Sequence, residues 1–251
     1  MEPKRVLIVQ NVSLEGPGFL GPGMAEAGWE LDLRRMDRAR STLPAALDGY
    51  QALIILGGPM GANDEDRFPY LGKVMRLIRD AAQRDLPTLG ICLGGQLIAK
   101  ALGGRVAKSQ RAELGWYRVS LTGAGQESPL FARFPESFPV FQWHEDAFEP
   151  PPGAELLVYG DAGCWNQAFR FGNRVYGLQF HLEVTPGMIE EWLRAYADDV
   201  RHAGGYGMGD RILEQTKKKD TMCRWLAGRF VGNWLDITGG SESGCGCCFS
   251  S

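Results

Sequence analysis

The sequence predicts an α/β fold in which a mostly parallel sheet is flanked by helices on both faces. Three apolar runs, residues 5–10, 52–56 and 86–91, have the length of strands and are continuous enough to be buried on both sides. Helix-like segments alternate with these runs, which is typical of a parallel sheet with crossover helices. In such a sheet the functional site lies at the carboxyl ends of the strands.

The first half of the chain supplies the parallel strands. Residues 5–10 form the first strand, and a Gly/Pro-rich loop and a helix near residues 19–27 follow it. Residues 30–34 alternate between apolar and polar side chains, as an edge strand does. The run 52–56 ends at a Gly-Gly-Pro turn, a strong signal for the end of a buried strand.

A long helix and the central strand come next. Apolar side chains recur at helical spacing, and Asp64 or Asp66 can cap the start of this helix. The apolar positions are Tyr70, Leu71, Val74, Met75 and Ile78. Residues 86–91 then form the central strand. Residues 106–176 predict short strands and turns, a small antiparallel extension of the sheet.

The C-terminal part is expected to be helical. Thr185 is placed to cap a helix over residues 187–198, with Pro186 in its first turn. A Gly-rich linker over residues 204–209 precedes a polar helical segment at 211–219 and then an amphipathic stripe. The stripe comprises Met222, Trp225, Leu226, Phe230 and Trp234. Packing of this stripe on the rest of the chain is favoured over docking of a partner, and both remain open.

A candidate nucleophile stands at the end of the central strand. The segment Gly-Ile-Cys92-Leu-Gly joins that strand to a helix-like stretch, residues 96–102. Glycines two residues before and after the cysteine leave room for a strained turn and for close helix packing. A sulfur at this apex lies at a helix N-terminus, where free N–H groups and the dipole favour a thiolate. The alternative is a buried structural cysteine, so a partner base is needed.

A candidate base lies much further along the chain. In the segment 174–184, β-branched and aromatic residues predict a strand. With period-two alternation, Gln179, His181 and Glu183 share one face of it. A carboxylate beside an imidazole holds its tautomer and stabilises the imidazolium. The prediction is therefore a triad of Cys92, His181 and Glu183.

These motifs together resemble the class I (triad) glutamine amidotransferase family, and its stand-alone, GMP-synthase-like members most of all. The resemblance spans about residues 4–200. It rests on Gly90-Ile-Cys92-Leu-Gly-Gly-Gln96, Gln179-Phe-His181-Leu-Glu183, Gly57-Gly-Pro-Met-Gly-Ala-Asn-Asp-Glu-Asp66, Glu113-Leu-Gly-Trp116, Trp143-His-Glu-Asp146 and Trp165-Asn-Gln-Ala-Phe169. It implies a flavodoxin-like class I glutaminase domain over residues 1–200. Beyond that domain, the residues themselves predict a helical extension at 201–238 and a Gly/Ser/Cys tail at 239–251 that is expected to be disordered.

The resemblance also implies roles for further residues. The backbone N–H groups of Gly58 and Leu93 would form an oxyanion hole, and Gln96 would contact the bound substrate. His144 and Asp146 follow an aromatic strand-like segment and are candidates for lining the pocket. No cofactor and no metal ion is implied.

The implied activity is hydrolysis of the glutamine γ-amide through a thioester on Cys92. It would release glutamate and ammonia, the ammonia for an unknown acceptor on a separate synthase subunit. One alternative is a γ-glutamyl peptidase that uses the same triad on glutathione-like peptides. The other is a catalytically silent binding or regulatory module, which is disfavoured because every triad residue is present.

The composition limits the possible partners and location. With 251 residues, 44% of them hydrophobic, the chain can bury a full core as one domain. A net charge of −3 without a basic patch argues against nucleic acid as a partner. No apolar run approaches the ~20 residues of a membrane span, and the N-terminus has the pattern of a strand rather than of a signal peptide. We therefore expect a cytoplasmic enzyme with reduced thiols and no membrane partner.

The other cysteines are not expected to take part in the chemistry. Cys164 and Cys223 lie in structured segments and are predicted to be packing residues. Cys245, Cys247 and Cys248 stand in the C-terminal tail, where three thiols without a fourth ligand do not make a closed zinc site. Cys248 is fourth from the end, but the residues around it do not match a prenylation signal.

Overall fold

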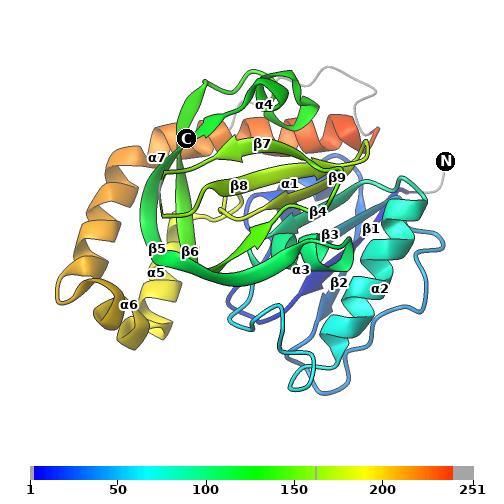
Figure 1. Ribbon diagram of the computed structural model, residues 1–251, viewed down its shortest axis with the longest axis horizontal. Helices are drawn as coiled ribbons and strands as arrows, with labels where there is room; N and C mark the ends of the chain where they lie inside the picture. The colour runs from blue at the N-terminus through cyan, green and yellow to red at the C-terminus, as the bar shows by residue number, and fades with distance from the viewer. Residues whose placement is uncertain (1–2, 162, 240–251) are drawn as a thin grey trace.

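One mixed sheet organises the molecule. The computed structural model describes residues 3–161 and 163–239, and within these ranges nine strands form one sheet in the order β2-β1-β3-β4-β9-β8-β7-β5-β6 (Figure 1). Five of these strands are parallel: β1 (Arg5–Gln10), β2 (Glu30–Arg35), β3 (Ala52–Ile55), β4 (Thr88–Ile91) and β9 (Val175–Leu178). The predicted α/β class with a mostly parallel sheet is confirmed. The three tail cysteines lie outside the described residues.

The antiparallel extension is more regular than predicted. It consists of β5 (Arg105–Leu121), β6 (Ser137–Glu149), β7 (Glu155–Tyr159) and β8 (Asn166–Phe171). The prediction of short strands was wrong for β5 and β6, which have 17 and 13 residues and form one long ribbon. The polar run 108–111 breaks the apolar alternation, but in the structure it lies at a register shift on an exposed part of the ribbon and does not end the strand.

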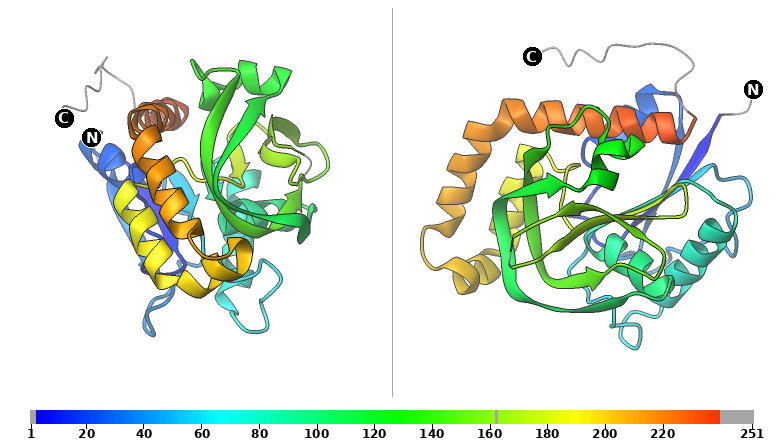
Figure 2. Two further views of the ribbon diagram at one scale, coloured as in Figure 1. Left: turned by 90° about the vertical axis from the view of Figure 1, so that its left-hand side faces the viewer. Right: turned by 45° about the horizontal axis from the view of Figure 1, so that its top comes forward.

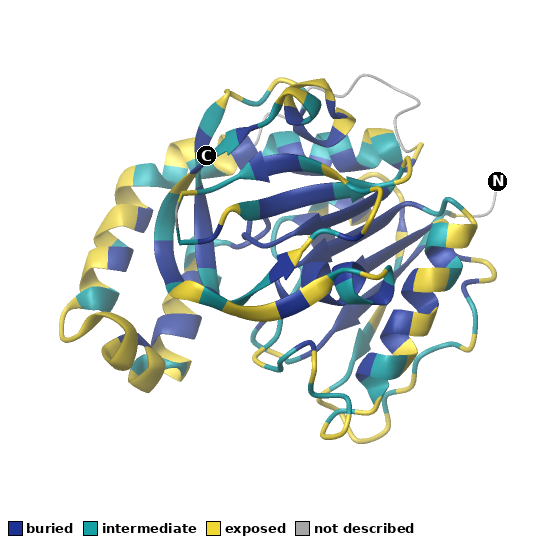
Figure 3. Ribbon diagram, viewed as in Figure 1, coloured by how far each residue is buried: buried dark blue, intermediate teal, exposed yellow. Residues whose placement is uncertain are grey.

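Helices cover both faces of the central parallel strands, whose alternate side chains are buried on both sides. Val6 and Ile8 of β1 pack with α1 (Leu20–Glu26) and α7 (Met208–Ile237). Leu7 and Val9 of the same strand point to the opposite face and pack with α2 (Tyr70–Gln83) and α3 (Leu93–Ala101). The strands between these layers are dark blue, the colour of buried residues (Figure 3). Short elements, α4 (Gly123–Glu127) and η1 (Pro129–Phe131), join β5 to β6.

The start of α2 differs from the expectation. Neither Asp64 nor Asp66 caps this helix, which begins at Tyr70 with Pro69 in the capping position. Asp64 instead accepts a hydrogen bond from the N–H of Gly61 at 2.9 Å and so stabilises the preceding loop. Short polar side chains favour such loop hydrogen bonds as readily as helix caps, so the sequence did not distinguish the two roles.

Helices α5 and α6 form a third layer with the start of α7. The Thr185 hydroxyl accepts a hydrogen bond from the N–H of Met188 at 3.2 Å and caps α5 (Pro186–Ala195), as predicted. The chain then continues as α6 (Ala197–Gly204), so the predicted Gly-rich linker shortens to residues 205–207. This layer packs around Trp192, Leu193, Val200 and Ile212.

The C-terminal helix α7 is one element of 30 residues, seen along its length in the right-hand view of Figure 2. Three residues of the predicted stripe, Leu226, Phe230 and Trp234, are fully buried. They lie in the core on the face of the sheet that α1 also covers. Met222 and Trp225 are 48% and 43% exposed. Packing on the rest of the chain is therefore confirmed for the buried three. Neither α7 nor any other helix within residues 3–161 and 163–239 is long and apolar enough to cross a membrane.

Trp234→Ala is expected to lower the free energy of unfolding by about 3–5 kcal/mol, because it removes a fully buried indole and leaves a cavity. Trp225→Ala, a matched change on the same helix, is expected to cost less than about 1 kcal/mol because its side chain is 43% exposed. Urea denaturation followed by circular dichroism measures both. Equal losses would contradict the placement of Trp234 in the core.

Candidate active site

Strand β4 delivers Cys92 to the apex of a strained turn. The strand ends at Ile91 and α3 begins at Leu93, which leaves Cys92 between them with φ 51° and ψ −110°. A non-glycine residue in such a conformation stores about 1–3 kcal/mol of strain, which the surrounding contacts must hold. The N–H of Cys92 donates to the carbonyl of Leu178 at 2.8 Å, so the turn is tied to the end of β9.

The two glycines that flank Cys92 allow α3 to pack closely on the sheet. A Cβ atom on Gly90 would overlap the carbonyl oxygen of Gly94, and a Cβ atom on Gly94 would overlap the carbonyl oxygen of Ile55. No larger residue fits at either position without a backbone shift. The predicted reason for these glycines, room for the helix against the strand, is therefore confirmed.

Strand β9 lies beside β4 in the sheet and brings His181 next to this turn. The side chains of His181 and Glu183 are 1% and 3% exposed, and Nδ1 of the ring lies 2.7 Å from Oε1 of the carboxylate. Because a carboxylate only accepts hydrogen bonds, Nδ1 carries the proton and donates it. The other ring nitrogen, Nε2, is then available to Cys92.

The predicted strand over residues 174–184 ends early, at Leu178. Beyond this point the chain leaves β9, and the N–H of His181 donates to the carbonyl of Phe141 at 2.9 Å in an isolated bridge. The predicted alternation of side chains between the two faces nevertheless continues beyond the end of the strand. Phe180 and Leu182 lie in the core, while His181 lines the cavity described below.

The protonation of His181 depends on its neighbours. Burial, the largest influence, lowers the pKa of His181, but the charge of Glu183 and the interactions with Cys92 together raise it well above its usual value. The imidazolium form is therefore stabilised beside the sulfur. This is the electrostatic arrangement that a thiol nucleophile needs, because the ring can take up the thiol proton.

A cavity of about 500 Å³ opens over Cys92 and His181. Its walls come from the loop after β3, from the β5–β6 ribbon and from α5 and α6. Six of the predicted site residues line it: Gly58, Cys92, Gln96, His144, Asp146 and His181. The other two, Glu183 and Leu93, lie directly behind the wall, against His181 and Gly58.

Gly58 and Leu93 lie side by side at one edge of this cavity. A Cβ atom on Gly58 would be 3.1 Å from Cδ2 of Leu93 and 2.8 Å from Cβ of Asn11. Leu93 is the first residue of α3, so its N–H has no acceptor within the helix. Nδ2 of Asn11 donates to the carbonyl of Gly57 at 2.9 Å and holds the loop that carries Gly58. This geometry is compatible with two adjacent N–H donors.

One backbone carbonyl connects three of the predicted pocket residues. The carbonyl of Asp146 accepts hydrogen bonds from Nε2 of Gln96 at 3.0 Å and from Nδ1 of His144 at 2.9 Å. Gln96 also donates to Oε1 of Gln179 at 3.4 Å. The carboxylate of Asp146 lies 3.4 Å from Nζ of Lys108. The Gln96 amide and the His144 ring are thus held in place at the cavity wall.

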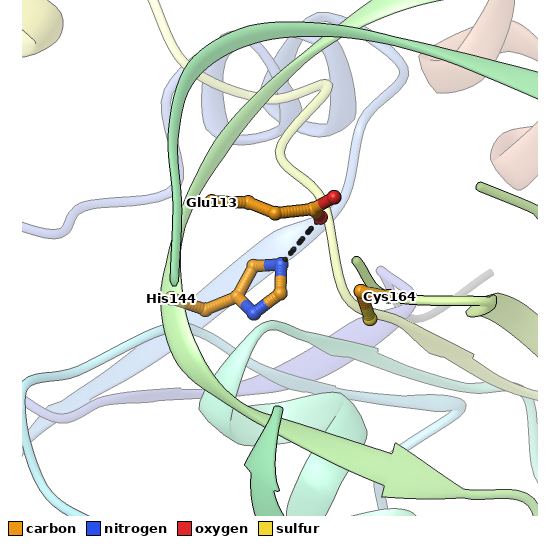
Figure 4. A group of neighbouring side chains, drawn as sticks. All are labelled: Glu113, His144 and Cys164. Atoms are coloured by element: carbon orange, nitrogen blue, oxygen red, sulfur yellow. Dashed lines mark hydrogen bonds and ion pairs between the residues drawn. The ribbon is translucent and has the colours of Figure 1, made fainter. Parts of the chain in front are cut away.

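A buried polar cluster around His144 was not predicted. Nε2 of His144 lies 3.0 Å from Oε2 of Glu113, and Nε2 of Gln167 donates to the same oxygen at 3.0 Å. Cys164 lies beside the pair (Figure 4). The signal was present in the sequence, because Glu113 and Gln167 both belong to motifs that carried the family resemblance.

The donor atoms of Glu113, His144 and Cys164 lie within 4.8 Å of one another, close enough for a metal ion. Their existing contacts fit a hydrogen-bond network better. Both ring nitrogens of His144 are engaged, with the carbonyl of Asp146 and with Glu113. Burial, with the charges of Glu113 and Asp161, raises the pKa of the Cys164 thiol to about 12, so it stays protonated. The cluster therefore orients His144, and Cys164 is a buried packing residue, as predicted.

Glu15 is a further cavity residue that the sequence reasoning missed. It lies in the Gly/Pro-rich loop after β1, lines the cavity and is 9% exposed. Burial raises the pKa of its carboxyl to about 7, with a lowering influence from His181 and a raising one from Glu183. A single acidic residue in a loop belongs to no periodic pattern, so nothing in the sequence distinguished it from a solvated side chain.

Glu15→Gln is expected to stabilise the fold more at high pH than at low pH. The carboxyl has a pKa of about 7 when folded and an ordinary value of 4.5, so the native state binds more protons between these limits and stability falls as the pH rises through them. The variant should therefore gain about 2 kcal/mol more near pH 8 than near pH 5. Urea titrations at both pH values measure this. A pH-independent difference would contradict the buried placement of Glu15.

Sequence comparisons place these residues among known proteins. Residues 22–196 match the profile of the family described as glutamine amidotransferase class-I. The glutamine amidotransferase-like protein YfeJ of Salmonella typhimurium is 32% identical over 204 residues, which cover 80% of this chain and 84% of that protein. A glutamine-hydrolysing GMP synthase subunit of Methanocaldococcus jannaschii is 36% identical over 119 residues, which cover 47% of this chain and 61% of that protein.

Solved structures share the fold over nearly the whole chain. A glutamine amidotransferase from Thermotoga maritima superposes with a TM-score of 0.84 at 30% sequence identity. The superposition covers 97% of this chain and 100% of that protein. A glutamine amidotransferase from Methylobacillus flagellatus has a TM-score of 0.84 at 29% identity and covers 100% of both chains. By profile, relatives and fold, the chain belongs to the class I glutamine amidotransferase family of enzymes.

Proposed function

We propose that this chain hydrolyses the γ-amide of glutamine through a γ-glutamyl thioester on Cys92. The observation that carries the proposal is the meeting, at one cavity, of a cysteine on a strained turn with the buried His181–Glu183 pair. The neighbouring strands β4 and β9 deliver these groups. Membership of the family supports the glutamine amide as the substrate.

The first step is proton transfer from the thiol of Cys92 to His181. The raised pKa of His181, which Glu183 and Cys92 maintain against burial, favours this transfer. The thiolate attacks the γ-carbonyl carbon of glutamine, and the carbonyl oxygen becomes an oxyanion. The adjacent N–H groups of Gly58 and Leu93 donate hydrogen bonds to it, which is the largest single contribution in many acyl-transfer sites.

The second step releases ammonia. His181 donates its Nε2 proton to the amide nitrogen, the C–N bond breaks, and the γ-glutamyl group remains on the sulfur. Water, deprotonated by His181, then attacks the thioester, and glutamate leaves as the thiol is restored. Glu183 remains ionised throughout and orients the ring. Gln96 and His144, held by the carbonyl of Asp146, contact the amino-acid end of the substrate.

A γ-glutamyl peptide is a second candidate substrate, and the size of the cavity favours it. Its volume of about 500 Å³ falls in the range of pockets that hold drug-sized ligands, and glutamine is much smaller than these. The wall continues from Trp192 to Tyr196, Asp199 and Ala203. A glutathione-like peptide would place its amine half in this additional space, and that amine would leave in place of ammonia.

A separate synthase subunit is the proposed acceptor of the ammonia. Support comes from relatives that are named as subunits of a glutamine-hydrolysing GMP synthase, in Methanocaldococcus jannaschii and Sulfurisphaera tokodaii. These relatives resemble this chain over about half of its length, 47% and 55%.

Incubation with glutamine and, separately, with glutathione distinguishes the two substrates. Ammonia released in step with glutamate supports the glutaminase, and release of cysteinylglycine supports the peptidase. Either activity must vanish in Cys92→Ala. If neither product forms with the wild type, or if either activity persists in Cys92→Ala, the proposed function is wrong.

A further inference from the structure

Glu15 differs from the other acidic residues that line the cavity. Its side chain is about nine-tenths buried, and within residues 3–161 and 163–239 no side chain or backbone group forms a hydrogen bond or ion pair with it. The others are paired or exposed: Asp64 accepts from the N–H of Gly61, Glu113 pairs with His144, Glu145 and Asp146 pair with Lys108, and Asp199 is exposed. Glu15 is therefore a buried acceptor that faces the cavity without a partner.

The position of this carboxyl relative to the proposed triad is well defined. A Cβ atom built on Gly57 would lie 2.5 Å from Oε2 of Glu15, 3.3 Å from Cε1 of His181 and 3.7 Å from Cβ of Cys92. Gly57 is thus close to the carboxyl of Glu15, to one edge of the His181 ring and to the Cβ atom of Cys92. Nδ1 of the ring is occupied by Glu183, so the edge with a free nitrogen is the one that runs from Cε1 to Nε2.

Gly58 follows Gly57 directly, but its Cα faces a different set of side chains. Gly58 faces Asn11, Leu93 and Met60, and none of its nearest contacts involves the carboxyl. An acyl group on Cys92 with its oxygen toward the N–H groups of Gly58 and Leu93 directs its leaving group toward Nε2 of His181. Because the carboxyl of Glu15 and Cε1 of His181 both lie close to Gly57, the carboxyl is within the part of the site toward which such a leaving group points.

We propose that the carboxylate of Glu15 binds the leaving amine, which is ammonia from glutamine or the amine half of a γ-glutamyl peptide. The inference rests on the proposed function and assigns one more residue to it. When His181 gives its Nε2 proton to the nitrogen of the tetrahedral intermediate, that nitrogen becomes a protonated amine while still bonded to carbon. The carboxylate accepts a hydrogen bond from it. The C–N bond then breaks, its electron pair stays on nitrogen, and a neutral amine departs.

The electrostatics around Glu15 agree with this role. Burial raises the pKa of Glu15 to about 7, because the nearby charge of His181 offsets only part of the cost of burying the carboxylate. A transient positive charge on the leaving nitrogen adds to that of the ring and stabilises the carboxylate further. A hydrogen bond between charged groups in such a desolvated site is stronger than one between neutral groups.

The test compares an amide with an ester of the same acid. Glutamine passes through a protonated amine, whereas glutamate γ-methyl ester releases neutral methanol and develops no cation on its leaving group. Glu15→Gln keeps the shape of the side chain and removes its charge. It is expected to lower kcat/KM for glutamine at least about tenfold more than kcat/KM for the ester. Glu191→Gln, which removes one charge from an exposed position on α5 outside the cavity wall, is the control and should leave the amide-to-ester ratio as in the wild type.

Equal losses on both substrates would overturn the proposal, because they would mean that Glu15 recognises the amino-acid end or only supports the loop. No loss on either substrate would overturn it as well. The proposed function is tested separately by Cys92→Ala in the same assay. If that variant retains ester or amide hydrolysis, the thioester mechanism fails whatever Glu15→Gln does; if it loses both, the ratio for Glu15→Gln decides the role of Glu15.

Discussion

Cys92→Ala is expected to lower the hydrolysis of glutamine or of a γ-glutamyl peptide by at least about 10³-fold, because Cys92 is the one thiol among the described residues that line the cavity. The fold should be retained. The change removes one sulfur atom from a residue that already has positive φ, and alanine carries the same Cβ strain as cysteine there. The expected change in the free energy of unfolding is about 1 kcal/mol or less. Ammonia release and urea denaturation of the same preparation measure the two effects.

The control for this variant is Cys223→Ala. Cys223 is a half-buried thiol on α7 outside the cavity wall, so its removal tests the loss of a thiol as such. This control should keep wild-type turnover. If Cys92→Ala retains even a tenth of the wild-type rate in a folded protein, the triad assignment fails.

Glu183→Gln is expected to lower turnover by about 10²–10⁴-fold, less than Cys92→Ala does. Oε1 of Glu183 accepts the proton of Nδ1 at 2.7 Å, and its charge is a main cause of the raised pKa of His181. An amide of the same shape removes the charge that stabilises the imidazolium and can present its NH₂ group to Nδ1, which selects the wrong tautomer. Steady-state rates at saturating glutamine measure the loss.

Residues that act as one unit do not give additive losses. The double variant Cys92→Ala/Glu183→Gln should therefore be no slower than Cys92→Ala alone. A further drop in the double variant would show that Glu183 works outside the triad, for example by supporting the structure around Trp192, whose ring lies 5.1 Å from that of His181.

The parts of the site that the sequence predicted best are those built from regular local structure. The turn at Cys92 follows from an apolar strand, two flanking glycines and a helix, and all three are local features. The facing of His181 and Glu183 was also predicted, although β9 ends at Leu178. It was preserved because Phe180 and Leu182 remain anchored in the core after the strand ends.

Features that depend on distant contacts were predicted less well. The antiparallel extension was predicted as short strands, whereas β5 continues as one strand through the polar run 108–111, where its register with β6 shifts. The burial of Trp234 and the exposure of Trp225 depend on where α7 contacts elements such as α1 and η1, and periodicity alone does not give these contacts. Glu15 lies beside Gly57 of the loop after β3 and close to His181 and Glu183, which follow β9. These neighbours are far away in the sequence, so the segment around Glu15 gives no sign of its burial.

The central claim is that Cys92 forms a covalent γ-glutamyl intermediate, and peptide mass mapping after treatment with 6-diazo-5-oxonorleucine tests it most directly. This glutamine analogue alkylates the nucleophile of a glutaminase site. The account predicts one adduct, on the peptide that contains Cys92, which glutamine competes away and which is absent from Cys92→Ala. An adduct on Cys164 or Cys223, or rapid glutamine hydrolysis by a protein that takes up no label, would contradict it.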